Sequence, residues 1–324
     1  MQRLLITLTL AAVNLAADKA PVILDTDIGT DIDDAFALAL VLASPELELR
    51  AVTTVSADAY GRALIACRML DEAGRAGVPV AAGRPPRPQP ETKGQYLYGQ
   101  QPGFSKRPVP ELAPQFLYQQ LRAEPGRLTI VSVGDLTNVA RLLTDHPEAR
   151  AWIKRIVIMG GAVRVGYNGQ PPPSWEWNIR SDIKGAQVVF ASGVPLTVAP
   201  LDATTTVKLA EPLRRRIFAA GTPLTGPLHA LYLLWGKTTP TLFDPVAVTL
   251  SFDESFCRME ALRLEVDDQG FTREVPGQPN ARVALSIRGE EFLEWYVRRL
   301  TRFSAASPPP RASSGCRRRR GRES

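Results

Sequence analysis

The chain has 324 residues, of which 44% are hydrophobic and 22% charged, an ordinary balance for a globular protein with a substantial core. Its net charge of +6 is concentrated in residues 304–324, where six Arg and one Glu give +5, so the rest carries only about +1. This distribution excludes a generally basic, nucleic-acid-binding body, and three cysteines exclude a disulfide framework.

The two ends differ in composition from the body of the chain. In residues 1–17, Arg3 precedes an apolar run that ends in small residues, which predicts a signal peptide cleaved near Ala17 and an exported protein, periplasmic or secreted. The run is too short for a transmembrane helix. An extra N-terminal strand in a cytoplasmic protein is the alternative. Residues 304–324 are rich in Pro, Ser and Arg, so we expect a disordered, solvated tail. A nucleic-acid or anionic-membrane role for residues 317–320 is the alternative, which the lack of stacking aromatic residues disfavours. Residues 18–303 then form the folded domain.

Strand-like and helix-like apolar runs alternate along this domain. A strand is predicted at residues 22–24, followed by an acidic turn at 25–35 and a buried helix at 36–42. Further strands are predicted at residues 49–55, 78–81, 128–133, 156–159, 196–199 and 261–266, and helices at 62–76, 115–123, 139–143, 183–191 and within 209–235. Segments 84–114 and 160–173, rich in Pro, Gln or Gly, are interpreted as lid insertions. The pattern predicts a single α/β domain with a mostly parallel central sheet flanked by helices.

The acidic turn reads Asp-Thr-Asp-Ile-Gly-Thr-Asp-Ile-Asp-Asp-Ala and places five carboxylates within ten residues. Charges this close repel one another, and a helix N-terminus at Asp33 and Asp34 relieves the repulsion only modestly. A hard cation with oxygen ligands would relieve far more of it, so the turn is a candidate metal site. The alternative is a solvated turn in which Asp31 or Asp33 caps the helix.

Polar or flexible residues also follow the other predicted strands. They are Asp58, Gly134, Asp135, Thr137, Asn138, Gly160, Gly161 and Asp202. Because the carboxyl ends of parallel strands meet at one edge of a sheet, we expect the binding site at that edge. Asp202 itself is interpreted as a structural residue that caps its turn.

The acidic turn resembles the signature of the inosine-uridine-preferring nucleoside hydrolases. Further matches follow in order along residues 21–250: Val52-Thr53-Thr54-Val55, Gly134-Asp135-Leu136-Thr137-Asn138, Ile158-Met159-Gly160-Gly161, Glu176-Trp177-Asn178, Leu201-Asp202 and Asp244-Pro245. The resemblance implies a calcium-dependent N-glycosidase that cleaves the bond between ribose and base in a small-molecule nucleoside and so serves nucleoside salvage. It also implies a homo-oligomer, a dimer or tetramer, with no nucleic-acid partner and no membrane insertion of the mature chain.

The resemblance assigns calcium to Asp27, Asp34, Asp244 and the main-chain carbonyl of Val133. The metal would hold the 2′- and 3′-hydroxyls of ribose together with the attacking water. Asp27 would be the general base, and coordination would lower the pKa of that water.

Substrate contacts are implied at further matching positions. Asp33 and Asn178 would hold the ribose hydroxyls and Glu176 the 5′-hydroxyl, with Asn168 a looser match at the 5′ end. Trp175 and Trp177, on either side of Glu176, would pack in the core or touch the base.

The sequence departs from the family pattern at three places. Two extra residues lie between Asp27 and Asp33, which leaves open whether Asp31 joins the metal ligands. Asp58 stands where many members have Asn, and Phe243 where many have a His that protonates the departing base. The chain has only two histidines, His146 and His229, which are interpreted as turn and helix-packing residues, so the acid is unassigned. Purine-selective members are similar at both positions, so Asp58 and Phe243 are predicted to contact substrate and to favour purine nucleosides.

Two functions other than hydrolysis of nucleosides are compatible with parts of the sequence. Residues 22–30 also resemble the first motif of haloacid-dehalogenase-like phosphatases, with Asp25 as nucleophile and magnesium as metal, but the late acidic pair Asp267-Asp268 lies in a turn-like stretch. An EF-hand fails because Thr30 and Phe36 stand where Gly and Glu are needed. A nucleoside-binding protein without catalysis is the non-enzyme alternative, and the retained Asp27 argues against it.

Overall fold

The computed structural model describes residues 18–304. The predicted signal peptide, and all but the first residue of the predicted C-terminal tail, lie outside this range. Among the described residues, no helix combines the length and the apolar character needed to cross a bilayer.

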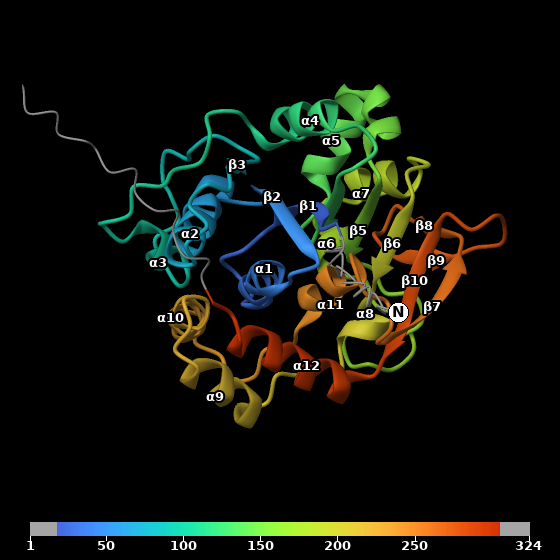
Figure 1. Cartoon of the computed structure of the whole chain (residues 1–324). Helices are drawn as coiled ribbons and strands as arrows, with labels where there is room; N and C mark the ends of the chain where they lie inside the picture. The colour runs from blue at the N-terminus through green and yellow to red at the C-terminus, as the bar shows by residue number, and fades with distance from the viewer. Residues whose placement is uncertain (1–17, 305–324) are drawn as a thin grey trace, which may run out of the picture.

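An eight-stranded sheet forms the centre of the molecule, in the order β3-β2-β1-β4-β5-β6-β10-β7 (Figure 1). Its strands are β1 (Ala20–Thr26), β2 (Leu47–Thr54), β3 (Val80–Ala82), β4 (Thr129–Ser132), β5 (Arg155–Met159), β6 (Leu196–Ala199), β7 (Cys257–Leu262) and β10 (Ala281–Ile287). Neighbours pair in parallel except β10 and β7, which are antiparallel. The prediction of a single α/β domain with a mostly parallel sheet is confirmed.

The end of the chain departs from the prediction. Instead of one strand at residues 261–266, the structure has the end of β7 and then β8 (Leu264–Val266), which pairs with β9 (Thr272–Glu274) in a separate two-stranded sheet. The Asn280 side chain accepts the backbone N–H of Leu264 and donates to its carbonyl, at 2.8 and 2.9 Å. This contact between distant residues turns the chain out of the central sheet, and nothing in the local pattern indicates it.

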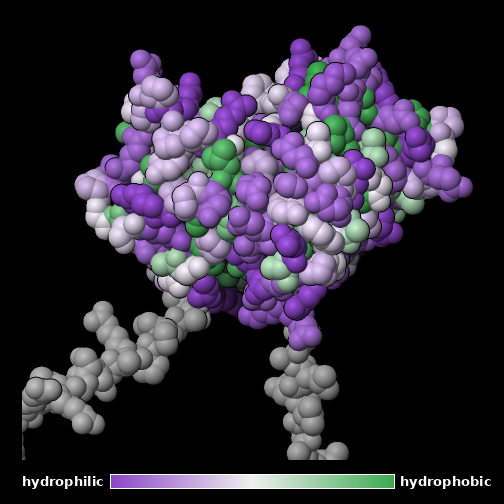
Figure 2. Space-filling model, turned by 90° about the horizontal axis from the view of Figure 1, so that it is seen from above, coloured by the Kyte–Doolittle hydropathy of each residue, from purple (hydrophilic) through white to green (hydrophobic). Residues whose placement is uncertain are grey.

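Helices cover both faces of the sheet (Figure 1). One face is packed by α1 (Asp33–Ala43), α2 (Ala59–Glu72), α10 (Thr225–Trp235), α11 (Phe243–Leu250) and α12 (Gly289–Thr301), and the other by α4 (Ala113–Ala123), α5 (Thr137–Asp145) and α7 (Ile183–Phe190). The remaining helices are α3 (Tyr96–Gln100), α6 (Trp177–Ser181), α8 (Leu201–Thr204), α9 (Glu211–Ala219) and the 3₁₀ helix η1 (Pro147–Trp152). Seen from above, the outer surface is largely hydrophilic, with hydrophobic side chains only in small groups (Figure 2).

Strand β1 and helix α1 flank the acidic turn and fix its position. Val22 and Leu24 belong to the core on one face of the sheet and Ile23 to the core on the other, as alternation along a strand requires. Helix α1 begins at Asp33 rather than at residue 36, with Ile32 at its N-cap and no side-chain cap, so neither Asp31 nor Asp33 caps it. Two carboxylates therefore lie within its first turn, where the helix dipole favours them.

The segment at 84–114 is more ordered than a loop. It contains α3, whose Tyr96 and Tyr98 are buried in the core beside α2. The Tyr98 hydroxyl donates to Glu72 at 3.0 Å, and the Arg68 guanidinium lies 4.0 Å from the Tyr98 ring centre. These contacts fasten the segment to α2.

Candidate active site

A cavity of about 460 Å³ opens at the carboxyl ends of the central strands. Eight of the ten residues that the resemblance singled out line it: Asp27, Asp33, Asp34, Val133, Glu176, Asn178, Phe243 and Asp244. They come from the turn after β1, the end of β4, α6 and the start of α11. Its position at the sheet edge agrees with the rule for open α/β sheets.

Three buried carboxylates meet at one point of this cavity. Oxygens of Asp33, Asp34 and Asp244 all lie within 4.8 Å of one another, and each residue is at most 4% exposed. Burial, reinforced by repulsion from the neighbouring carboxylates, raises the pKa of all three groups well above the ordinary value. Two oxygens on one calcium ion are at most about 5 Å apart. The donor set therefore fits a hard divalent cation in both chemistry and spacing.

Asp27 lines the same cavity beside this group, and it is 8% exposed. Its backbone N–H donates to the Asp34 carboxylate at 3.1 Å, and the Arg62 guanidinium lies 3.9 Å from its own carboxylate. Burial raises the pKa of Asp27 to about 6, while Arg62 opposes the shift. The chain at Gly134, just after β4, lies close to Asp27: a Cβ atom added to Gly134 would be only 3.0 Å from the backbone nitrogen of Asp27.

Asp25 is separate from the cavity, although it opens the acidic motif. It is fully buried and accepts hydrogen bonds from Thr53 at 2.7 Å, Ser132 at 3.2 Å and Asn138 at 2.8 Å. It thus joins β1 to β2 and β4 and to α5. Burial raises its pKa to about 7. A carboxylate enclosed in this way cannot be the nucleophile of a phosphatase.

Glu176 and Asn178 shape the opposite wall. Glu176 is the N-cap of α6 and accepts the backbone N–H groups of Gly161, Asn178 and Ile179 at 3.0 to 3.1 Å. The Asn178 amide donates to the carbonyl of Val133 at 2.9 Å and to that of Met159 at 3.1 Å. These bonds hold both side chains in place along the cavity wall.

The structure places two predicted substrate contacts outside the cavity lining. Asp58 is 1% exposed, and its carboxylate accepts Gly61 N–H at 3.0 Å and Glu91 N–H at 2.9 Å, so it caps α2 and anchors the segment at 84–114. Asn168 is exposed and accepts Gln170 N–H at 2.9 Å within its own turn. Ser56 and Ala57, just before Asp58, line the cavity instead, with positive φ of 67° and 38°.

Trp177 lines the cavity, as one of its two predicted roles requires, whereas the lining residues Arg62, Tyr167 and Lys237 were not assigned to the site from the sequence. The Tyr167 ring meets Phe243 edge-on at 6.3 Å, and its hydroxyl accepts the Trp177 N–H at 3.0 Å. Phe243, Tyr167 and Trp177, which is 60% exposed, all line the cavity and together form its aromatic rim. The Gly- and Pro-rich sequence around Tyr167 predicted an insertion but did not indicate that Tyr167 lines the cavity.

Both histidines pack against aromatic rings away from the cavity. His146 stacks on Tyr118 at 3.8 Å, and His229 stacks on Phe218 at 4.5 Å. Neither is in position to protonate a departing base. Asp202 accepts the N–H groups of Val163 and Arg164 at 2.9 and 2.8 Å, which is a structural role.

Comparison with known proteins agrees with this fold. A family model described as inosine-uridine preferring nucleoside hydrolase matches residues 22–294. The chain is 33% identical to the pyrimidine-specific ribonucleoside hydrolase RihA of Citrobacter koseri, across 88% of this chain and 99% of that protein. It is 32% identical to RihA of Salmonella typhimurium, across 88% and 99%.

Solved structures give the same result. The plant nucleoside hydrolase PpNRh1 superposes with a TM-score of 0.78 at 26% identity, covering 88% of this chain and all of that one. A purine-preferring ribonucleoside hydrolase from Gardnerella vaginalis superposes with a TM-score of 0.76 at 24% identity, over 87% and 98%, and supports the fold alone. The fold and site define a hydrolase that acts on N-glycosyl compounds. The chain belongs to the inosine-uridine-preferring nucleoside hydrolase family.

Proposed function

We propose that this protein is a calcium-dependent ribonucleoside hydrolase that releases ribose and the free base. The observation that carries the proposal is the group of buried carboxylates Asp33, Asp34 and Asp244 beside Asp27 at the sheet edge. Calcium would be held by Asp27, Asp34 and Asp244, with the Val133 carbonyl as a further ligand. The ion would supply positive charge that binds the sugar diol and makes water more acidic.

Each side chain has a distinct task in the proposed reaction. The Asp27 carboxylate takes the proton of the attacking water as that water adds to the ribose carbon. Asp33 and Asn178 orient the ribose hydroxyls, and Glu176 receives the 5′-hydroxyl. The negative charge of these carboxylates favours the oxocarbenium-like state in which the sugar becomes cationic. The electron pair of the broken C–N bond leaves with the base, which takes up a proton from solvent, and Asp27 returns its proton to solvent.

The aromatic rim supports a role in recognising the base. Phe243 and Tyr167 present ring faces and edges at the cavity, where a departing base can stack. Phe243 favours purine nucleosides, and this remains our preferred substrate class. The second candidate class is pyrimidine nucleosides, because the similar RihA proteins are described as pyrimidine-specific. Asp58 lends no support to either, since both its oxygens bind backbone.

An assay with purine and pyrimidine nucleosides, following reducing sugar with and without EGTA, tests the proposal. We expect ribose release that calcium restores after chelation, with larger kcat/KM for inosine or adenosine than for uridine or cytidine. Absence of ribose release from every nucleoside would refute the activity. Larger values for uridine and cytidine would establish the second candidate. We further propose export, on the pattern of residues 1–17, and a homo-oligomer, on the family resemblance.

A further inference from the structure

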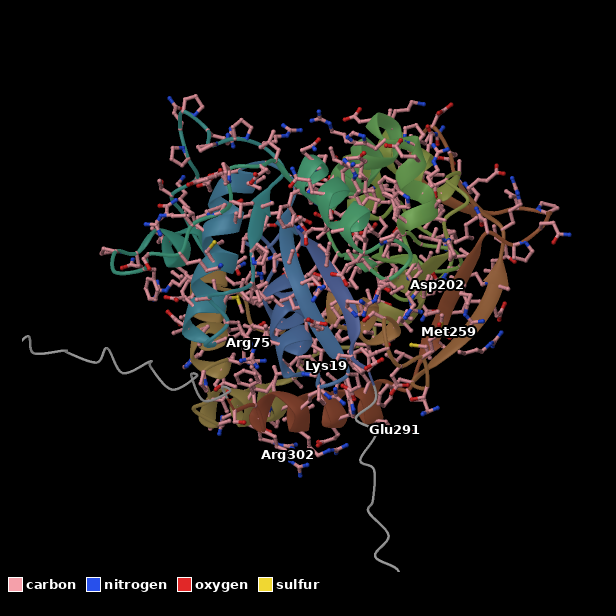
Figure 3. All side chains as sticks on the ribbon, turned by 45° about the horizontal axis from the view of Figure 1, so that its top comes forward. Lys19, Arg75, Asp202, Met259, Glu291 and Arg302 are labelled. Atoms are coloured by element: carbon pink, nitrogen blue, oxygen red, sulfur yellow. The ribbon has the colours of Figure 1, made fainter. Side chains whose placement is uncertain are left out.

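A second and larger cavity, of about 800 Å³, lies at the opposite end of the sheet. It is bounded by the start of β1 and β2, the end of α1 and the last turn of α12. Strand β1 runs from Ala20 at this cavity to Thr26 near the candidate active site, so the two cavities open at opposite strand ends. Figure 3 shows Lys19, Arg75 and Arg302 at the end of the molecule where α12 lies.

The lining of this cavity carries an excess of positive charge. Lys19, Arg75, Arg298 and Arg302 line it, and within residues 18–304 none of the four forms an ion pair with a carboxylate. Its one carboxylate, that of Glu48, pairs with Arg50 at 2.7 Å. Four cations around one concave site repel each other, and an anion there would relieve the repulsion.

Flat aromatic rings stand among these cations. Phe303 and Trp295 line the cavity, with the Arg75 guanidinium 5.8 Å from the Phe303 ring centre and the Arg299 guanidinium 4.4 Å from that of Trp295. Arg299 also forms an ion pair with Glu46, so its positive charge is already balanced. A guanidinium that rests on a ring keeps its N–H donors for a bidentate acceptor such as phosphate.

The neighbouring ends of the chain are poor in acidic residues. Residues 1–17, which precede Asp18 and Lys19, contain no Asp or Glu. Residues 305–324, which follow the lining residue Ser304, contain six Arg and one Glu. Among the described lining residues no carboxylate is left to balance these four cations, and the cavity volume suits a small molecule.

We propose that this cavity binds a small phosphate-bearing anion. Arg75, Arg298 and Arg302 contact its phosphate oxygens, with Lys19 as a further point charge. Two sources share this chemistry, a free inorganic anion such as pyrophosphate and a nucleotide whose ring stacks against Phe303 or Trp295. The site is distinct from the candidate active site, so its test does not depend on nucleoside hydrolysis.

Calorimetric titration of the full chain, with EGTA present, tests the proposal with pyrophosphate and with AMP as probes. Two double variants of equal net charge are compared: Arg298→Ala/Arg302→Ala at the cavity, and Arg122→Ala/Arg150→Ala at exposed arginines that do not line it. We expect saturable binding that weakens at least tenfold in the first double variant and stays within twofold in the second. Tighter binding of AMP than of pyrophosphate would assign a nucleotide, and the reverse a free anion.

Two results would overturn the proposal. One is no saturable binding of either probe to the wild-type chain. The other is an equal loss in both double variants, which would mean attraction by net charge alone. Because Arg298, in the last turn of α12, and Arg302, which follows that helix, are both exposed, we expect both variants to retain the wild-type melting temperature and ribose release.

Discussion

The backbone N–H of Asp244 donates to the carboxylate of Asp33 at 3.4 Å, across 211 residues of sequence. The contact joins the first turn of α11 to the first turn of α1, so the N-termini of two buried helices point at one group of carboxylates. Both helix dipoles favour negative charge there, but each contributes only about 0.3–1 kcal/mol when exposed and up to about 2 kcal/mol when partly buried. That is small beside the cost of burying three carboxylates together, so the proposed cation would be the larger stabilising factor.

Asp27→Asn keeps the size of the side chain but removes its ability to accept a proton. We expect ribose release to fall by about 10²–10⁴-fold, the usual contribution of a general base, with further loss from weaker cation binding. The reducing-sugar assay measures the effect, and far-ultraviolet circular dichroism verifies the fold. Asp268→Asn, at an exposed carboxylate remote from the cavity, is the matched control. Turnover at the wild-type rate in Asp27→Asn would rule out its assignment as base.

Asp244→Asn is expected to change stability in opposite directions with and without calcium. In EGTA the variant should melt at a higher temperature than the wild type, because one of three mutually repelling buried carboxylates is gone. In excess calcium it should melt lower than the wild type, which gains about 2.7 kcal/mol at 100 times the dissociation constant. Thermal melts of both proteins in both buffers give the answer. If calcium stabilises the two proteins equally, Asp244 is not a ligand.

The metal-free protein should lose stability as the pH rises from about 4 to about 7. Burial raises the folded-state pKa of Asp25 to about 7 and those of Asp33, Asp34 and Asp244 well above the ordinary 3.8. In that pH range the folded chain binds more protons than the unfolded chain, so the free energy of unfolding decreases with pH. Urea titrations in EGTA at several pH values measure it.

Calcium should reverse much of this trend, because the ion favours ionised ligands. Asp25 does not line the cavity, so its part of the slope should persist in calcium. A metal-free protein whose stability rises steadily through this range would contradict the proposed state of the carboxylates.

Phe243→Leu tests the aromatic rim. The change retains an apolar side chain but removes the ring that meets Tyr167 edge-on. Since aromatic contacts contribute about 0.5–1.5 kcal/mol beyond burial, we expect kcat/KM to fall about 2- to 12-fold for inosine and less for uridine. Steady-state kinetics with both nucleosides measure the ratio. Phe218→Leu, a ring change beneath His229 outside this cavity, is the control. An equal loss for both nucleosides would show that Phe243 does not select the base.

Local sequence determined the main strands and helices of this protein and the position of its acidic turn. The short β-branched run before Asp25 predicts a buried strand, and the uninterrupted apolar run after Asp34 predicts a buried helix. Such predictions are possible because the length and spacing of apolar runs differ between strands and helices. When strands and helices alternate along a chain, only a few connections between them are possible, and these give a parallel sheet. Ligands bind at the carboxyl edge of such a sheet. The motif therefore located the carboxylates of the turn after β1 without any knowledge of the tertiary structure.

Tertiary structure decided how those residues are used. Asp25 and Asp27 are two positions apart, yet one is enclosed by Thr53, Ser132 and Asn138 while the other faces the cavity. Asp58 follows a strand as a site residue should, but backbone N–H groups occupy both its oxygens. Hydrogen-bond partners, and burial beside groups distant in sequence, depend on packing in three dimensions. A linear pattern records the type of a side chain and its place on an element, but not the neighbours that fix its charge and its role.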